Sequence, residues 1–147
     1  MKKLVMSLMS IAAVLIAFSG AAFAGDYGKQ KAVYHINSGD AKTHMAALRN
    51  IQNHINAVGA ENMEIKVVMH SGGVDLLKGA KANEDLRSRV DSLKMQNVEF
   101  QVCANTLKGK GIDYKKDLYD VKESDIVPSG VAHLSHLQGQ GYTYVKP

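Results

Sequence analysis

The chain has 147 residues, a formal net charge of +4 and one cysteine, Cys103. A single cysteine excludes an internal disulfide, so a hydrophobic core must stabilise the fold. The small positive charge predicts no nucleic-acid partner, because the basic residues between Lys108 and Lys116 have only Tyr114 among them as a stacking surface. Such a cluster is typical of a solvated surface.

Residues 1–24 have the pattern of a secretory signal peptide. Two lysines are followed by an apolar run from Leu4 to Phe18, and Ala22-Phe23-Ala24 provides a cleavage site. The apolar run is short for a membrane-spanning helix, so the pattern favours cleavage over anchoring. We expect a periplasmic or otherwise exported protein, with no membrane contact after cleavage and one domain over residues 25–147.

The first half of that domain alternates strands and helices. Lys31–Ile36 is predicted to be a strand, and the turn Asn37 to Asp40 offers capping residues to a helix over Ala41–Val58. Met63–Met69 is predicted to be the second strand, because it is short and rich in Val and Ile. A short helical turn over Val74–Gly79 follows, and then a helix opened by residues 83–85.

The second half continues the alternation. The expected elements are a strand over Val98–Val102, a short helix from Ala104, a helical segment over Asp113–Val121, a strand over Asp125–Pro128, a helix capped by Ser129 and a strand over Tyr142–Val145. Five strands with intervening helices predict an α/β fold with a mainly parallel sheet that is covered on both faces. Polar residues alternate with apolar ones in strands two and three, so part of one face should meet solvent or a partner.

Cys103 is the strongest candidate for chemistry. It lies where the third strand passes into a helix, close to free backbone N–H groups that favour a thiolate. A thiolate can attack a sulfane sulfur and hold it as a persulfide. Oxidoreductases with a C-x-x-C motif need a second cysteine, which this chain lacks. A buried structural cysteine is the alternative.

His70 ends the second strand as Cys103 ends the third, so the two side chains meet only if these strands are neighbours. A 3-2-1 strand order would place the strands about 5 Å apart, and a 2-1-3 order about 10 Å apart. The alternative is that His70 only caps its strand or contacts the glycine turn after it.

The other histidines give no metal pattern. His133 and His136 share a helix face but lack an evident third ligand, and His35, His44 and His54 show no ligand spacing. We therefore expect no metal and no cofactor. Gly72 and Gly73 could shape an anion-binding turn, although they form neither a P-loop nor a dinucleotide motif.

Four segments together resemble the DsrE/DsrF-like family: HINSGD, VVMHSGGVDLL, VEFQVCANTLKGKGI and IVPSGVAHLSHLQGQGYTYVKP. The resemblance implies a three-layer α/β/α fold with a five-stranded parallel sheet in the order 4-3-2-1-5, and a homo-oligomer. It also implies that a cysteine matching Cys103 carries sulfur as a persulfide, although relatives in the cytoplasm act with partner subunits.

Two functional hypotheses follow. The first is a periplasmic sulfane-sulfur carrier or sulfurtransferase that exchanges sulfur with donor and acceptor thiols or proteins through Cys103, with His70 as its companion. The second is a non-catalytic module of the same fold that binds a small anion or a protein. The predicted binding residues lie in the turns after the strands: Asn37, Ser38, Ser71, Gly72, Gly73, Ala104 and Asn105.

Overall fold

The computed structural model describes residues 27–147, so the predicted signal peptide lies outside the described residues. Five parallel strands form one sheet in the order β4-β3-β2-β1-β5, which confirms the predicted α/β fold and strand order. The strands are β1 (Gln30–Ile36), β2 (Met63–Met69), β3 (Glu99–Cys103), β4 (Ile126–Val127) and β5 (Thr143–Val145).

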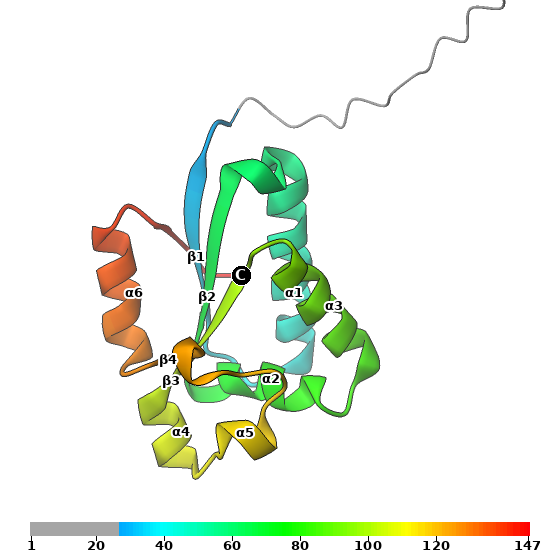
Figure 1. The fold of residues 1–147 in the computed structure, drawn as a ribbon, viewed down its shortest axis with the longest axis vertical. Coiled ribbons are helices and arrows are strands. Elements are labelled where there is room, and N and C mark those ends of the chain that lie inside the picture. The colour runs from blue at the N-terminus through cyan, green and yellow to red at the C-terminus, as the bar shows by residue number, and fades with distance from the viewer. Residues whose placement is uncertain (1–26) are drawn as a thin grey trace, which may run out of the picture.

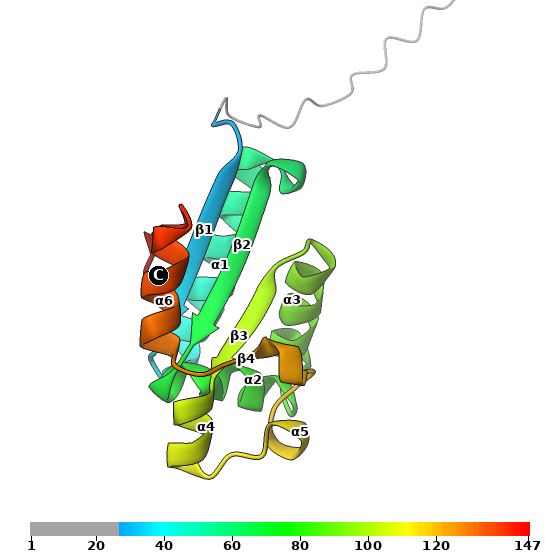
Figure 2. The ribbon, with the colours of Figure 1, turned by 60° about the vertical axis from the view of Figure 1, so that its left-hand side comes forward.

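Helices cover the sheet unequally (Figures 1 and 2). Helices α1 and α3 lie on one side of the strands, with α2 at their lower end, and α6 lies on the other side. The helices are α1 (Ala41–Val58), α2 (Asp75–Ala80), α3 (Glu84–Met95), α4 (Ala104–Lys110), α5 (Tyr114–Asp117) and α6 (Gly130–Gly139), and the short 3-10 turns are η1 (Ala60–Asn62), η2 (Ser71–Val74) and η3 (Glu123–Asp125).

The three longest helices begin where the sequence places capping side chains. The side chains of Asp40, Asn83 and Ser129 each accept a hydrogen bond from a backbone N–H in the first turn of α1, α3 and α6. These bonds satisfy donors that have no partner within the helix. Helix α1 ends at Gly59, whose φ of 93° is one that residues with a side chain rarely adopt.

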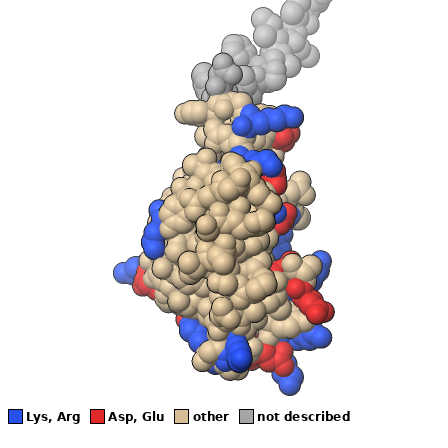
Figure 3. Space-filling model, turned by 90° about the vertical axis from the view of Figure 1, so that its left-hand side faces the viewer, with Lys and Arg blue, Asp and Glu red and all other residues tan. Residues whose placement is uncertain are grey.

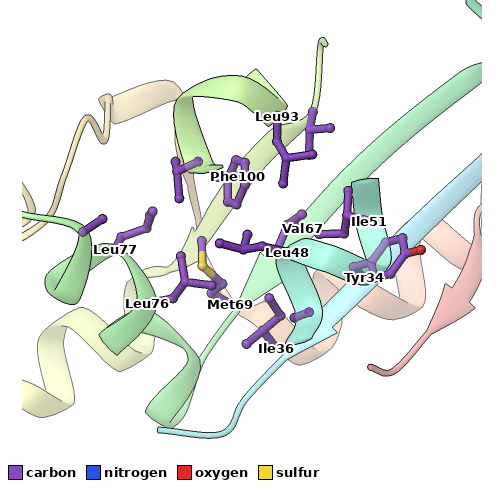
Figure 4. Close-up of a cluster of buried hydrophobic side chains, with 14 of the residues drawn as sticks. Tyr34, Ile36, Leu48, Ile51, Val67, Met69, Leu76, Leu77, Leu93 and Phe100 are labelled. Atoms are coloured by element: carbon purple, nitrogen blue, oxygen red, sulfur yellow. The ribbon is translucent and has the colours of Figure 1, made fainter. Parts of the chain in front are cut away.

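The main hydrophobic core lies between the sheet and helices α1, α2 and α3 (Figure 4). Alternate strand residues such as Tyr34, Val67 and Phe100 point into it, and α1 adds Leu48 and Ile51. The opposite face has a much smaller core beneath α6, formed by Val33, Val68, Leu134, Leu137 and Tyr142. Because side chains alternate along a strand, the residues between the main-core positions face α6.

That second face carries the polar residues noted in strands two and three. Lys66 lies opposite Glu99 in the parallel register, and their side chains form an ion pair of 2.6 Å. Glu64 accepts a hydrogen bond from the hydroxyl of Tyr142 and forms an ion pair with Lys31. The polar alternation therefore marks the sheet face that α6 only partly covers.

Two local predictions need correction. The segment Asp113–Val121 is helical only at α5, and Asp120 has a positive φ of 46°. Its apolar residues instead pack as irregular chain against the main core. The chain after β2 begins with the 3-10 turn η2, and α2 starts one residue later than predicted, at Asp75. Within residues 27–147, no helix has the length and apolar character needed to cross a membrane.

Candidate active site at the carboxyl edge of the sheet

Four side chains that can take part in chemistry, those of His35, His70, Cys103 and Tyr144, lie on the α6 face near the carboxyl ends of their strands. His35 is flanked in β1 by Tyr34 and Ile36, which both face the main core, so His35 faces α6. The same alternation places Cys103 and Tyr144 on that face, together with His70, which directly follows β2. Parallel strand order brings these groups to one edge of the sheet.

The sulfur of Cys103 is surrounded by hydrogen-bond donors. Cys103 is the N-cap of α4 without a side-chain capping hydrogen bond, and the donors near its sulfur are the backbone N–H groups of Gly130, Thr106 and Asn105 and the Thr106 hydroxyl. Burial raises the pKa of the Cys103 thiol, but these donors outweigh burial and lower the pKa from its ordinary value. The residue is 5% exposed.

Thr106 joins Cys103 to the chain that follows β2. Its hydroxyl oxygen accepts a hydrogen bond of 2.9 Å from the backbone N–H of Ser71. A hydroxyl that accepts one bond can still donate its own hydrogen, which here goes to the sulfur of Cys103. Ser71 has a positive φ of 52°, a conformation that costs about 1–2 kcal/mol for a residue with a side chain. The strain places its N–H toward Thr106.

His70 belongs to a row of hydrogen bonds that runs away from Cys103 toward β5. Its Nδ1 lies 3.0 Å from the hydroxyl oxygen of Ser71, and its Nε2 lies 2.7 Å from Nε2 of His35. On the far side, Nδ1 of His35 lies 2.6 Å from the hydroxyl oxygen of Tyr144. The row therefore contains Ser71, His70, His35 and Tyr144.

Both imidazoles in this row bind protons weakly. Burial, the charge of His70 and the charge of Lys146 lower the pKa of His35 to about 4. Burial, followed by the charge of Lys146, also lowers the pKa of His70. Each ring loses hydration and sits near a cation, and both effects disfavour an added positive charge. The two rings are therefore mainly neutral at pH 7.

His70 and Cys103 are close neighbours separated by Gly130. A Cβ atom added to Gly130 would lie 3.1 Å from Cβ of His70 and 3.2 Å from Cβ of Cys103. The strand order that would allow the two side chains to meet is therefore present. Both ring nitrogens of His70, however, are hydrogen-bonded to Ser71 and His35, so neither bonds the sulfur of Cys103.

The turns predicted to bind a ligand lie beside this edge, and several of their residues also make hydrogen bonds or close backbone contacts. Asn37 accepts a hydrogen bond from Lys146, and the backbone carbonyl of Ser38 bonds Nε2 of His44. Gly73 has no room for a side chain, because a Cβ would lie 1.9 Å from the Ile36 carbonyl oxygen. A Cβ added to Gly72 would similarly lie 2.4 Å from the backbone nitrogen of Gly39. Close approach of two backbone segments explains both glycines.

The two histidines of α6 lie apart from the row. Nε2 of His133 bonds the side-chain oxygen of Gln101 at 2.9 Å, and His136 is exposed. In the described part of the chain, no three His, Cys, Asp or Glu side chains gather as a metal site would require. The expectation of no metal and no cofactor stays a prediction.

Sequence reasoning found Cys103, His70 and Ser71 but missed His35, Thr106, Gly130 and Tyr144. His35 and Tyr144 are 109 residues apart, and they meet because β5 pairs with β1. The sequence did offer one signal: strand alternation puts His35 on the same face as the residue after β2. Thr106 follows Cys103 by one helical turn, a spacing that lets a side chain return toward the N-cap.

Comparisons with known proteins agree with this fold. The model of the DsrE/DsrF-like family matches residues 30–147. The solved structure of MTH1491, a protein of unknown function from Methanobacterium thermoautotrophicum, is 32% identical, with a TM-score of 0.70 over 81% of this chain and 100% of that one. No curated protein matches. The family match covers the whole described sheet and the segment that holds Cys103, and the chain therefore belongs to the DsrE/DsrF-like family.

Proposed function

We propose that this protein is an exported carrier of sulfane sulfur, in which Cys103 accepts a sulfur atom as a persulfide and passes it to another thiol. Membership of the DsrE family suggests a sulfur-relay role. The periplasmic location rests on the signal-peptide pattern of residues 1–24. The donor and acceptor would be thiol compounds or thiol proteins.

The hydrogen-bond donors around the sulfur of Cys103 are the observation that carries this proposal. Three backbone N–H groups and one hydroxyl lower the pKa of its thiol despite burial. A purely structural cysteine in an apolar core has no need of such donors, and burial alone would raise its thiol pKa. Donors that favour the thiolate instead prepare the nucleophilic form of the side chain.

The transfer itself needs no external oxidant. The Cys103 thiolate attacks the outer sulfur of a donor persulfide or polysulfide, and a new S–S bond forms at Sγ. The S–S bond in the donor breaks, and its electron pair leaves with the remaining donor sulfur as a thiolate. The same donors that hold the Cys103 thiolate can then hold the terminal sulfur of the new persulfide.

Intact-mass measurement tests the proposal. The protein without residues 1–24 is exposed to inorganic polysulfide, freed of excess reagent and weighed before and after treatment with a thiol reductant. Wild type should gain the mass of one or more sulfur atoms and lose it on reduction, and Cys103→Ser should gain none. Equal gains in both proteins, or no gain in wild type, would contradict the proposal.

A second candidate function is a non-catalytic binding or assembly module. Figure 3 shows a broad surface without Lys, Arg, Asp or Glu, with charged side chains toward its edges. Helix α6 contains no such residue, and Val131 on it is 66% exposed. This surface supports the expected homo-oligomer. Under this alternative, the native Cys103 thiol would react slowly with a small alkylating reagent, whereas the carrier proposal requires rapid reaction.

A further inference from the structure

We propose that Ser71, His70, His35 and Tyr144 form a proton relay that takes the proton from an acceptor thiol while that thiol removes sulfur from Cys103. This inference rests on the proposed function, because it names the groups that serve sulfur exchange at that site. The relay runs along the carboxyl edge of the sheet, from Ser71 beside Cys103 to Tyr144 at the opposite end.

The contact between His35 and His70 couples the hydrogen positions of the two rings. Their Nε2 atoms are 2.7 Å apart, too close for anything except a hydrogen bond, so one nitrogen carries the hydrogen and the other accepts it. The ring centroids are 4.7 Å apart with 29° between the planes, so the rings meet at their nitrogen atoms. Two protonated rings would point hydrogens at each other, and the pair therefore holds at most one added proton.

The row has two complete arrangements of its hydrogens. In the first, Tyr144 donates to His35, His35 donates to His70, and His70 donates to Ser71. In the second, every bond is reversed, and the Ser71 hydroxyl donates to His70. All three contacts lie between 2.6 and 3.0 Å, so each can carry a hydrogen in either direction. When a proton enters at Ser71, the row changes from the second arrangement to the first, and another proton leaves at Tyr144.

Both ends of the row can exchange protons with their surroundings. Ser71 is exposed, and its backbone N–H bonds Thr106, which in turn bonds Cys103. A thiol that approaches Cys103 therefore comes close to the Ser71 hydroxyl. Tyr144 is 39% exposed on β5. His70 has no free nitrogen to meet a thiol, so a proton must enter through Ser71.

The groups around the row favour proton acceptance followed by release. Lys146, which follows β5, is the cation outside the pair that acts on both rings, and Cys103 ends the neighbouring β3. Gly130 of α6 packs against His70 without a charge. Lys146 disfavours lasting protonation of the rings, so the row is neutral at pH 7 and passes a proton on to the opposite end without holding it.

The complete step balances. The acceptor thiol gives its proton to the Ser71 hydroxyl, which passes its own hydrogen to His70. His70 passes its Nε2 hydrogen to His35, His35 passes its Nδ1 hydrogen to the Tyr144 oxygen, and the exposed Tyr144 hydroxyl releases its original proton to water. The acceptor thiolate attacks the outer sulfur of the Cys103 persulfide and forms a new S–S bond. The bond from that sulfur to Sγ breaks, and its electron pair remains on Cys103 as the thiolate.

Single-turnover kinetics on the loaded protein test the relay. Cys103 is loaded with polysulfide, and the rate of sulfur return is measured across pH with two acceptors, 2-mercaptoethanol and sulfite. We expect Ser71→Ala and His35→Asn to slow transfer to the thiol by roughly a hundredfold near neutral pH, a typical contribution of acid-base catalysis. Sulfite reacts as an anion without a thiol proton, so its rate should stay within about twofold of wild type. His136→Asn, at an exposed histidine outside the row, is the matched control and should leave both transfer rates unchanged.

A second measurement tests the row independently of sulfur chemistry. Nitrogen-15 NMR of the histidine rings should show His35 and His70 taking up protons in two coupled steps, and Tyr144→Phe should change their tautomers but not that of His54. Equal slowing with sulfite and thiol, or independent titration of the two rings, would overturn the relay. If Cys103 takes up no sulfur, the proposed function fails, and the NMR result still decides whether the row shares its protons.

Discussion

The two faces of the sheet are built for different tasks. The face beneath α1, α2 and α3 is apolar and holds most of the buried side chains, whereas the face beneath α6 has five buried core residues and a set of polar groups. Cys103, His70, His35 and Tyr144 all belong to the second face or its edge. Stability and proposed chemistry are therefore separated across one sheet, so substitutions on each face should have different consequences.

The largest effect on stability is expected from Ile51→Ala in α1. Ile51 is fully buried in the main core, and loss of three methyl or methylene groups there costs about 2–5 kcal/mol in the free energy of unfolding. The measurement is equilibrium denaturation by urea. Glu99→Ala, which removes an ion pair whose carboxylate is 56% exposed on the α6 face, should cost no more than about 1 kcal/mol. Equal losses would remove the contrast between the faces.

A smaller effect is expected from Gly130→Ala, which places a methyl group between His70 and Cys103. The new Cβ would lie 3.1–3.3 Å from atoms of both side chains, so overpacking should cost about 1–3 kcal/mol and slow alkylation of Cys103. Gly139→Ala at the other end of α6 is the matched control, because its Cβ meets no atom within 4 Å. If the two variants lose the same stability and alkylate at the same rate, Gly130 does not separate the side chains of His70 and Cys103 as described.

Thr106→Val should have a modest effect on stability and a clear one on the thiol. Loss of the hydroxyl removes one donor to Cys103 and one acceptor for Ser71, which costs about 0.5–1.5 kcal/mol. The pKa of Cys103 should rise, because the thiolate loses a hydrogen bond while burial persists. The pH dependence of alkylation measures this change. Thr106→Ser, which keeps the hydroxyl, should keep the wild-type pKa of Cys103. Equal Cys103 pKa values in Thr106→Val and Thr106→Ser would contradict the role of the Thr106 hydroxyl.

The last effect is expected in the pH dependence of stability, where partly buried His35 contributes. Its folded pKa is about 4, below the ordinary 6.5, so the unfolded chain binds more protons between these values. The contribution of His35 therefore lowers stability as pH falls from 6.5 toward 4. Denaturation of wild type and His35→Asn over this range isolates that contribution, and wild type should lose more. Parallel curves would show that the His35 pKa is unshifted.

The sequence allowed the fold to be predicted because each element carries a local signal. Apolar spacing and the caps at Asp40 and Gly59 define α1 with its observed limits, and the short Val-rich runs define β1 to β3 within one residue. The segment after Gly111 misled the prediction, because its apolar residues pack on the core without forming helical turns. A polar or apolar pattern alone cannot distinguish those two ways of burying a side chain.

The candidate site was only partly predictable. Cys103 stands out because the strand ends at a helix start, and its hydrogen-bond donors from Asn105 and Thr106 follow from that position. The donor from Gly130 comes from another helix, and the contact of His35 with Tyr144 depends on the pairing of β5 with β1. Such contacts arise from tertiary packing, which local sequence patterns do not encode.

The most direct test of the central claim compares the thiol pKa of Cys103 in the folded and unfolded protein. The rate of iodoacetamide alkylation is followed across pH under native conditions and again in urea, with the single cysteine as the only reactive thiol. The hydrogen bonds around the sulfur predict a lower pKa in the folded protein and rapid labelling near neutral pH. A folded-state pKa equal to or above that of the unfolded chain would contradict the account.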